Sequence, residues 1–99
     1  MLHIINKNDG NGAVLNDCMQ VVTNGSSILL IENGIYCGVK NQLMLLDKNL
    51  FNEVDLYVLT SDLEARGIQL ESCYGFVKPI SYSGFVQLVA DNNPVRSWF

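Results

Sequence analysis

Three cysteines and a single histidine are the side chains in this sequence best suited to covalent chemistry. Cys18, Cys37 and Cys73 are widely spaced, no two of them form a C-x-x-C pair, and His3 is the only histidine among 99 residues. An odd, scattered set of cysteines does not make a disulfide framework, and one histidine does not make a zinc site of the usual kind. We therefore expect no metal and no disulfide, and the free thiols indicate a reducing, cytoplasmic setting.

Cys18 is the one candidate for a catalytic, sulfur-bearing thiol. A reactive thiol needs exposure and a lowered pKa. Cys18 instead lies one helical turn from both Val14 and Val22 in an apolar stripe, beside Asp17, whose negative charge disfavours a thiolate. We favour a buried packing role for Cys18 and keep sulfur transfer as the alternative.

The other reactive side chains are weaker candidates. Cys37 lies close to the carboxyl end of a strand predicted over residues 27–31, where crevices form in α/β sheets. No role suggests itself for Cys73. His3 lies inside the first predicted strand, where a packed side chain is commoner than a catalytic one.

A glycine-bearing loop, Asp9–Gly12, occupies the position where doubly wound folds bind phosphate. A dinucleotide loop needs a third glycine, and Leu15 stands in its place. The lysine and hydroxyl pair of a P-loop is also missing from the sequence. We expect a plain turn and no cofactor, with a nucleotide-binding module as the alternative.

Strands and helices alternate along the chain. Strand-like apolar runs occupy five segments: 2–5, 27–31, 56–59, 74–80 and 95–99. Helical signals occupy five others: 13–22, 35–40, 42–51, 61–66 and 83–91. The alternation predicts an α/β fold over residues 1–99 as a single domain, a three-layer sandwich with a small, mostly parallel sheet of four to five strands flanked by helices.

Local signals mark the ends of the predicted helices. Gly25 follows a helix and is free to adopt the left-handed conformation that terminates one, and Gly67 ends the short helix that precedes it. Ser61 and Glu64 have the spacing of a capping box, in which each side chain bonds the backbone amide of the other residue.

The composition excludes several classes of function. Apolar residues make up 48% of the chain and charged ones 16%, which excludes a disordered protein and indicates a partner subunit for the surplus apolar surface. The net charge is −4 and the basic residues are scattered, so we expect no direct nucleic-acid binding. The longest apolar runs have four residues, so we expect no membrane span. Tyr36, Trp98 and Phe99 are the candidate interface residues, although the terminal aromatic pair is equally suited to closing the core.

Five blocks of this sequence, taken in order and spacing, resemble the TusB/DsrH family of small sulfur-relay subunits. They are Met1–Lys7, Ile28–Tyr36, Leu56–Gly67, Tyr82–Val86 and Val95–Phe99. The resemblance covers nearly the whole chain and implies a compact α/β sandwich. It also implies a heterohexamer, in which two copies each of TusB-like, TusC-like and TusD-like subunits assemble.

In that family the complex carries persulfide sulfur from a TusA-like donor towards a TusE-like acceptor, for 2-thiolation of the tRNA wobble uridine. The resemblance places the carrier cysteine on the TusD/DsrE-like subunit, so this chain is expected to be non-catalytic and not to contact tRNA directly. Cys18 matches the helix cysteine of DsrH-like members by its spacing from Leu15, and Cys37 stands where relatives usually have alanine. Two alternatives stay open: a DsrH-type subunit working with DsrE-like and DsrF-like partners in sulfur oxidation, and a sulfurtransferase acting through Cys18.

Overall fold

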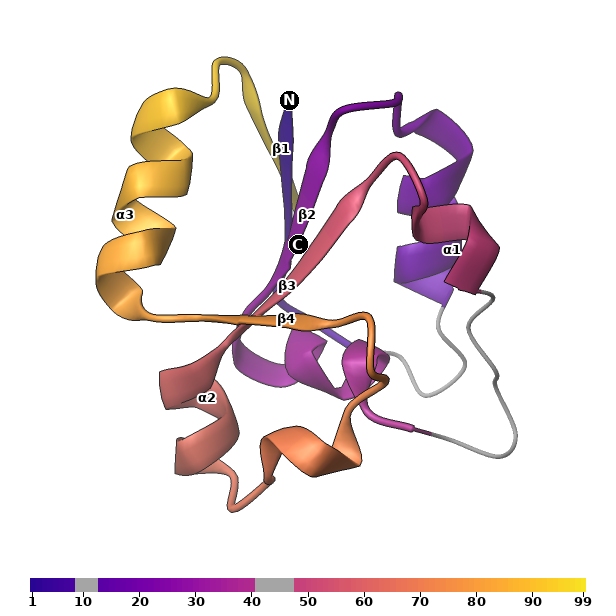
Figure 1. Ribbon diagram of the computed structural model, residues 1–99. Coiled ribbons are helices and arrows are strands. Elements are labelled where there is room, and N and C mark those ends of the chain that lie inside the picture. The colour runs from indigo at the N-terminus through magenta and orange to yellow at the C-terminus, as the bar shows by residue number, and fades with distance from the viewer. Residues whose placement is uncertain (9–12, 41–47) are drawn as a thin grey trace.

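The computed structural model describes residues 1–8, 13–40 and 48–99 and contains a parallel five-stranded sheet (Figure 1). The strands run in the order β4-β3-β2-β1-β5. Their bounds are β1 (Leu2–Ile5), β2 (Ser27–Leu30), β3 (Asp55–Leu59), β4 (Lys78–Ile80) and β5 (Val95–Trp98). Each neighbouring pair is parallel. The predicted α/β class with a small parallel sheet is confirmed.

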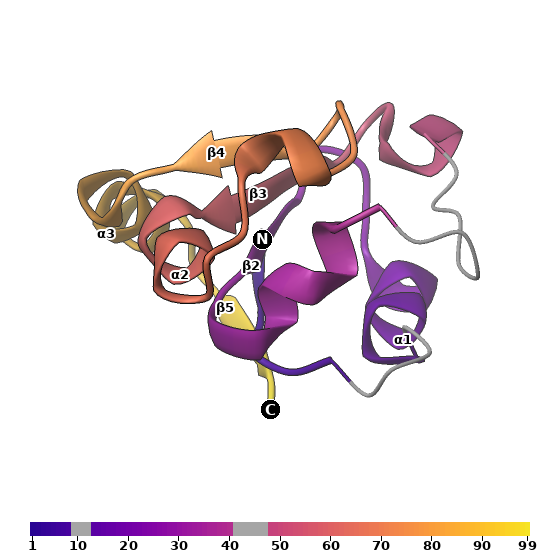
Figure 2. The ribbon, with the colours of Figure 1, turned by 90° about the horizontal axis from the view of Figure 1, so that it is seen from below.

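Helices cover the two faces of the sheet and one of its ends. One face carries α1 (Ala13–Val21) and the 3₁₀ helix η1 (Glu32–Gly38), while the other carries α3 (Tyr82–Asp91) (Figures 1 and 2). The short helices α2 (Thr60–Ala65) and η3 (Leu70–Ser72) lie beyond the carboxyl ends of the strands. A further 3₁₀ turn, η2 (Lys48–Phe51), precedes β3. The strand order explains why α3 covers a different face from α1. From β1 to β4 each new strand is added on the same side of the previous one, whereas the chain then returns through α3 and places β5 on the other side of β1.

The core follows from strands that are apolar on consecutive positions. On the α3 side, Leu2, Ile4 and Leu29 are buried against Phe85 and Leu88 of that helix. The α1 side holds the larger cluster, which includes Ile5, Ile28, Leu30, Leu56 and Val58. Burial of both faces of β1 and β2 is the reason that their sequences show no polar alternation.

Two predicted elements differ from the structure. The strand predicted over 74–80 is shorter, because Tyr74 pairs with η1 through its amide, which donates to the Gly38 carbonyl at 3.0 Å. A turn closed by the Val77 amide on the Tyr74 carbonyl then precedes β4. The capping box was also wrong: α2 begins at Thr60, so Ser61 lies within the helix and no side chain caps it.

Other local expectations have mixed outcomes. Gly25 has a φ of +85°, which confirms its left-handed conformation, and Gly67, after α2, has a φ of +66°. The short helical turn predicted at 35–40 begins earlier, at Glu32, and is a 3₁₀ helix. Most of the helix predicted over 42–51 falls outside the described residues, as does the Asp9–Gly12 loop, and its last residues form η2.

Candidate functional site

Cys18 is completely buried in the face of α1 that packs on the sheet. Burial raises the pKa of its thiol to about 11, and the opposing effect of the positive charge on Arg96 is smaller. At neutral pH on the order of one molecule in ten thousand carries the thiolate, which is the nucleophilic form. The expected burial of Cys18 is confirmed, and this environment suits packing better than sulfur chemistry.

His3, Trp98 and Arg96 form a group of contacts between β1 and β5. The Trp98 Nε1–H donates to His3 Nδ1 at 3.2 Å, and the Arg96 guanidinium lies 4.2 Å from the centre of the indole ring. His3 is 1% exposed, and burial followed by the nearby Arg96 charge lowers its pKa. His3 is therefore a neutral hydrogen-bond acceptor inside the sheet, and Trp98 closes the edge of the core against it.

The buried histidine makes stability depend on pH. Burial lowers the pKa of His3 in the folded protein below its ordinary value of 6.5, so folding favours the neutral imidazole. The free energy of unfolding is therefore at its full value above pH 6.5 and decreases as the pH falls through the folded-state pKa. We expect the free energy of unfolding, measured by urea titration, to fall from about pH 7.5 to about pH 5.5. His3→Gln keeps an acceptor for Trp98, and since His3 is the only histidine, this variant should lose the decline. An equal decline in both proteins would contradict this account.

The candidate interface residues separate into two groups. Trp98 is half-buried and packs against the main core cluster, whereas Phe99 is 69% exposed and Tyr36 is 40% exposed. Of the two alternatives for the terminal aromatic pair, core closure describes Trp98, and Phe99 stays available to a partner.

The two remaining cysteines occupy unlike surroundings. Cys37 lies in η1 and is half-buried. Its Sγ is 3.9 Å from the Lys7 carbonyl oxygen and 4.0 Å from Asn8 Oδ1. Cys73 is buried, and desolvation raises the pKa of its thiol. All three cysteines are free thiols.

A set of polar contacts, called the latch below, joins η1 to α2 beyond the carboxyl ends of β2 and β3. It is formed by Glu32, Asn33, Asp62 and Arg66, and the sequence did not predict it. Asp62 Oδ2 accepts the backbone amide of Glu32 at 2.6 Å, and Arg66 Nε donates to Asn33 Oδ1 at 3.1 Å. The Asp62 and Arg66 side chains also pair at 3.8 Å. Glu32 has a left-handed φ of +51°, which the bond to Asp62 helps to hold. The latch therefore joins two of the five sequence blocks that carry the family resemblance, Ile28–Tyr36 and Leu56–Gly67.

The latch predicts a measurable loss of stability when Asp62 is truncated. Asp62→Ala leaves the Glu32 amide without its carboxylate partner, and we expect a cost of about 1.5 kcal/mol in chemical denaturation. Glu64→Ala, on an exposed position of the same helix, is the matched control and should change stability by less than about 0.5 kcal/mol. Equal effects of the two substitutions would argue against the latch.

None of the helices in residues 1–8, 13–40 and 48–99 is long and apolar enough to cross a membrane. Within the same ranges no three His, Cys, Asp or Glu side chains gather in a way that could hold a metal ion.

The fold defines the chain as a small parallel α/β sandwich, and two solved structures share this architecture. The crystal structure of the ychN protein from E. coli has a TM-score of 0.70, with 13% identity and 97% of each chain covered. The solution structure of protein Tm0979 from Thermotoga maritima has a TM-score of 0.62 with 21% identity, covering 95% of this chain and 97% of that one. At these identities the similarity is one of fold.

Sequence comparison identifies the family. The model of the family described as "DsrH like protein" matches residues 11–95, so the chain belongs to the DsrH-like family. It is 33% identical over 100 residues to Protein TusB of Buchnera aphidicola subsp. Baizongia pistaciae, covering 99% of this chain and 100% of that one. Protein TusB of Pectobacterium parmentieri is 30% identical over 98 residues, with 99% and 100% covered. This membership confirms the resemblance and supports the assignment of a sulfur-relay subunit.

Proposed function

We propose that this chain is a non-catalytic subunit of a TusBCD-type complex that supplies sulfur for 2-thiolation of the tRNA wobble uridine. It acts as one TusB/DsrH-like domain over residues 1–99, beside TusC-like and TusD-like subunits in a heterohexamer. The complex takes sulfur from a TusA-like donor and passes it to a TusE-like acceptor in the cytoplasm. End-to-end similarity to two TusB proteins favours this branch over sulfur oxidation.

Burial of Cys18 is the observation that carries the non-catalytic role. In persulfide transfer the acceptor thiolate attacks the outer sulfur of the donor persulfide, and the donor leaves as a thiolate. Cys18 has no exposed surface, and its pKa of about 11 keeps it protonated. The helix thiol that resembles that of DsrH-like chains is therefore poorly suited to accept sulfur.

An apolar stripe on an exposed side of α3 supports the association with other subunits. Phe85 and Leu88 pack on the sheet, whereas Tyr82, Val86 and Val89 recur at helical spacing on a neighbouring side of the helix and are exposed. Exposed apolar side chains grouped in this way are typical of a surface that another chain covers.

Co-expression tests the assembly. The full chain, tagged and produced with the TusC-like and TusD-like proteins of the same genome, should copurify with both in equal amounts. Light scattering should then give the mass of two copies of each subunit. Copurification with DsrE-like and DsrF-like proteins instead would favour the sulfur-oxidation branch, and a chain that binds neither pair would contradict the proposed function.

Mass spectrometry tests the alternative in which Cys18 carries sulfur. After incubation of the assembled complex with a persulfide donor, we expect the added mass of one sulfur atom on the TusD-like subunit and none on Cys18. Cys18→Ala should cost about 1 kcal/mol of stability for the lost buried group and leave this pattern unchanged. A sulfur adduct on Cys18 at comparable occupancy would make this chain a sulfurtransferase.

A further inference from the structure

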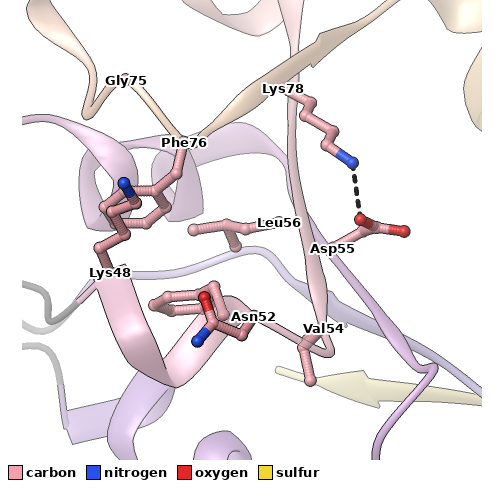
Figure 3. Close-up of a pocket in the computed structure, with 9 residues that line it drawn as sticks. Lys48, Asn52, Val54, Asp55, Leu56, Gly75, Phe76 and Lys78 are labelled. Carbon is pink, nitrogen blue, oxygen red and sulfur yellow. Dashed lines mark hydrogen bonds and ion pairs between the residues drawn. The ribbon is translucent and has the colours of Figure 1, made fainter.

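A pocket of about 340 Å³ lies at the amino-terminal ends of β3 and β4 (Figure 3). The latch lies at the opposite, carboxyl ends of the strands. Its walls come from η2 and the residues after it, from the start of β3 and from the turn before β4. The lining residues that the argument uses are Lys48, Phe51, Asn52, Asp55, Phe76 and Lys78. No cysteine lines the pocket, so the proposed sulfur chemistry gives it no role.

The floor of the pocket is aromatic and apolar. Phe51 and Phe76 stack with ring centres 5.1 Å apart at 22°, and Tyr74 extends the stack 5.5 Å beyond Phe76. Phe51 and Phe76 are both only half-buried, so they offer ring surface to the pocket. A surface of this kind favours a flat, apolar ligand body.

The rim of the pocket carries an excess positive charge. Lys78 pairs with Asp55 at 2.6 Å on one side, so these two charges neutralise each other. Lys48 also lines the pocket (Figure 3), and its ammonium has no ion pair or hydrogen bond within the part of the chain that the structure describes. Among the described residues that line the pocket, one cation is therefore not neutralised, although the whole protein has a net charge of −4. Asn52 adds an amide that can donate or accept.

We propose that this pocket binds a small, planar aromatic anion, with its ring on the Phe51–Phe76 surface and its acid group at Lys48. The volume lies at the lower end of the range for ligand sites and suits a molecule of one or two fused rings. The acid group would receive a charge-assisted hydrogen bond from the Lys48 ammonium. This inference rests on the pocket alone and stands independently of the proposed function.

Titration of the full chain by amide NMR tests the proposal with three probes that share one ring system. We expect indole-3-acetate to bind saturably and to shift the signals of Asn52, Gly75 and Phe76. The neutral indole-3-acetamide should bind about fivefold more weakly and the cation tryptamine more weakly still. Absence of saturable shifts at these residues up to the solubility limit of indole-3-acetate would overturn the proposal.

Two variants test the contact of the acid group with Lys48 separately from the contact of the ring with Phe51 and Phe76. Lys48→Met keeps an exposed chain of similar length and should weaken indole-3-acetate about fivefold while leaving indole-3-acetamide unchanged. Lys7→Met removes an exposed lysine that does not line the pocket and should change neither affinity. If the three probes bind equally, or if Lys48→Met leaves the affinity for the acid unchanged, the assigned anion site is wrong.

Discussion

Gly34→Ala is expected to be among the most destabilising single substitutions in this protein. A Cβ atom at this position would meet the Ile5 carbonyl oxygen at a distance far below any real contact. That oxygen is not free to move, because it accepts the Ile31 amide at 2.9 Å where η1 joins the sheet. We expect a loss of about 3 kcal/mol or more, a large fraction of the stability of a small domain.

Thermal unfolding followed by circular dichroism measures this effect. For a chain of this size the midpoint should fall by about 12 °C or more. Gly75→Ala is the matched control, since its added Cβ would meet nothing within 4 Å and the residue has an ordinary φ. Its midpoint should change by no more than about 4 °C. A Gly34→Ala protein as stable as the control would show that η1 does not pack against β1 as described.

Trp98→Ala should have the second large effect, again on stability. The substitution removes ring contacts with the main core cluster, the hydrogen bond to His3 and the stacking with Arg96. It also leaves His3 buried without its donor, which adds a desolvation penalty. We expect a cost of about 3 kcal/mol in urea titration.

Two further variants distinguish core closure from partner docking. Trp98→Phe keeps most of the apolar contact and loses the hydrogen bond, so it should cost about 1.5 kcal/mol. Phe99→Ala removes a ring that is 69% exposed and should change the stability of the isolated chain by less than about 0.5 kcal/mol. If Phe99→Ala were as damaging as Trp98→Ala, the two rings would be acting together in the core.

Much of the fold could be predicted because its signals are local. The strands β1, β2 and β3 are apolar runs without polar alternation, which is the pattern of a parallel sheet buried on both faces. The burial of Cys18 followed in the same way from the apolar stripe of α1. The length of β4 was not predictable, because the residues before it pair with Gly38 and Val39, far away in the sequence.

The polar contacts of the candidate site depended on pairs that are remote in sequence. Asp62 bonds an amide 30 residues away, and Trp98 bonds a histidine 95 residues away. Local spacing instead pointed to a capping box around Asp62, since Ser61 and Glu64 have the required separation. Only the sheet order, which brings β5 beside β1, identifies His3 as the partner of Trp98.

The 2-thiouridine content of tRNA tests the central claim most directly, in cells whose only copy of this chain has all three cysteines replaced by alanine. Deletion of the chain is the reference, and copurification with the TusC-like and TusD-like subunits verifies assembly of the variant. We predict that 2-thiouridine is lost on deletion and retained when the cysteine-free chain is present. Full thiolation after deletion would contradict a role in the relay. Loss of thiolation with an assembled, cysteine-free complex would contradict the non-catalytic role.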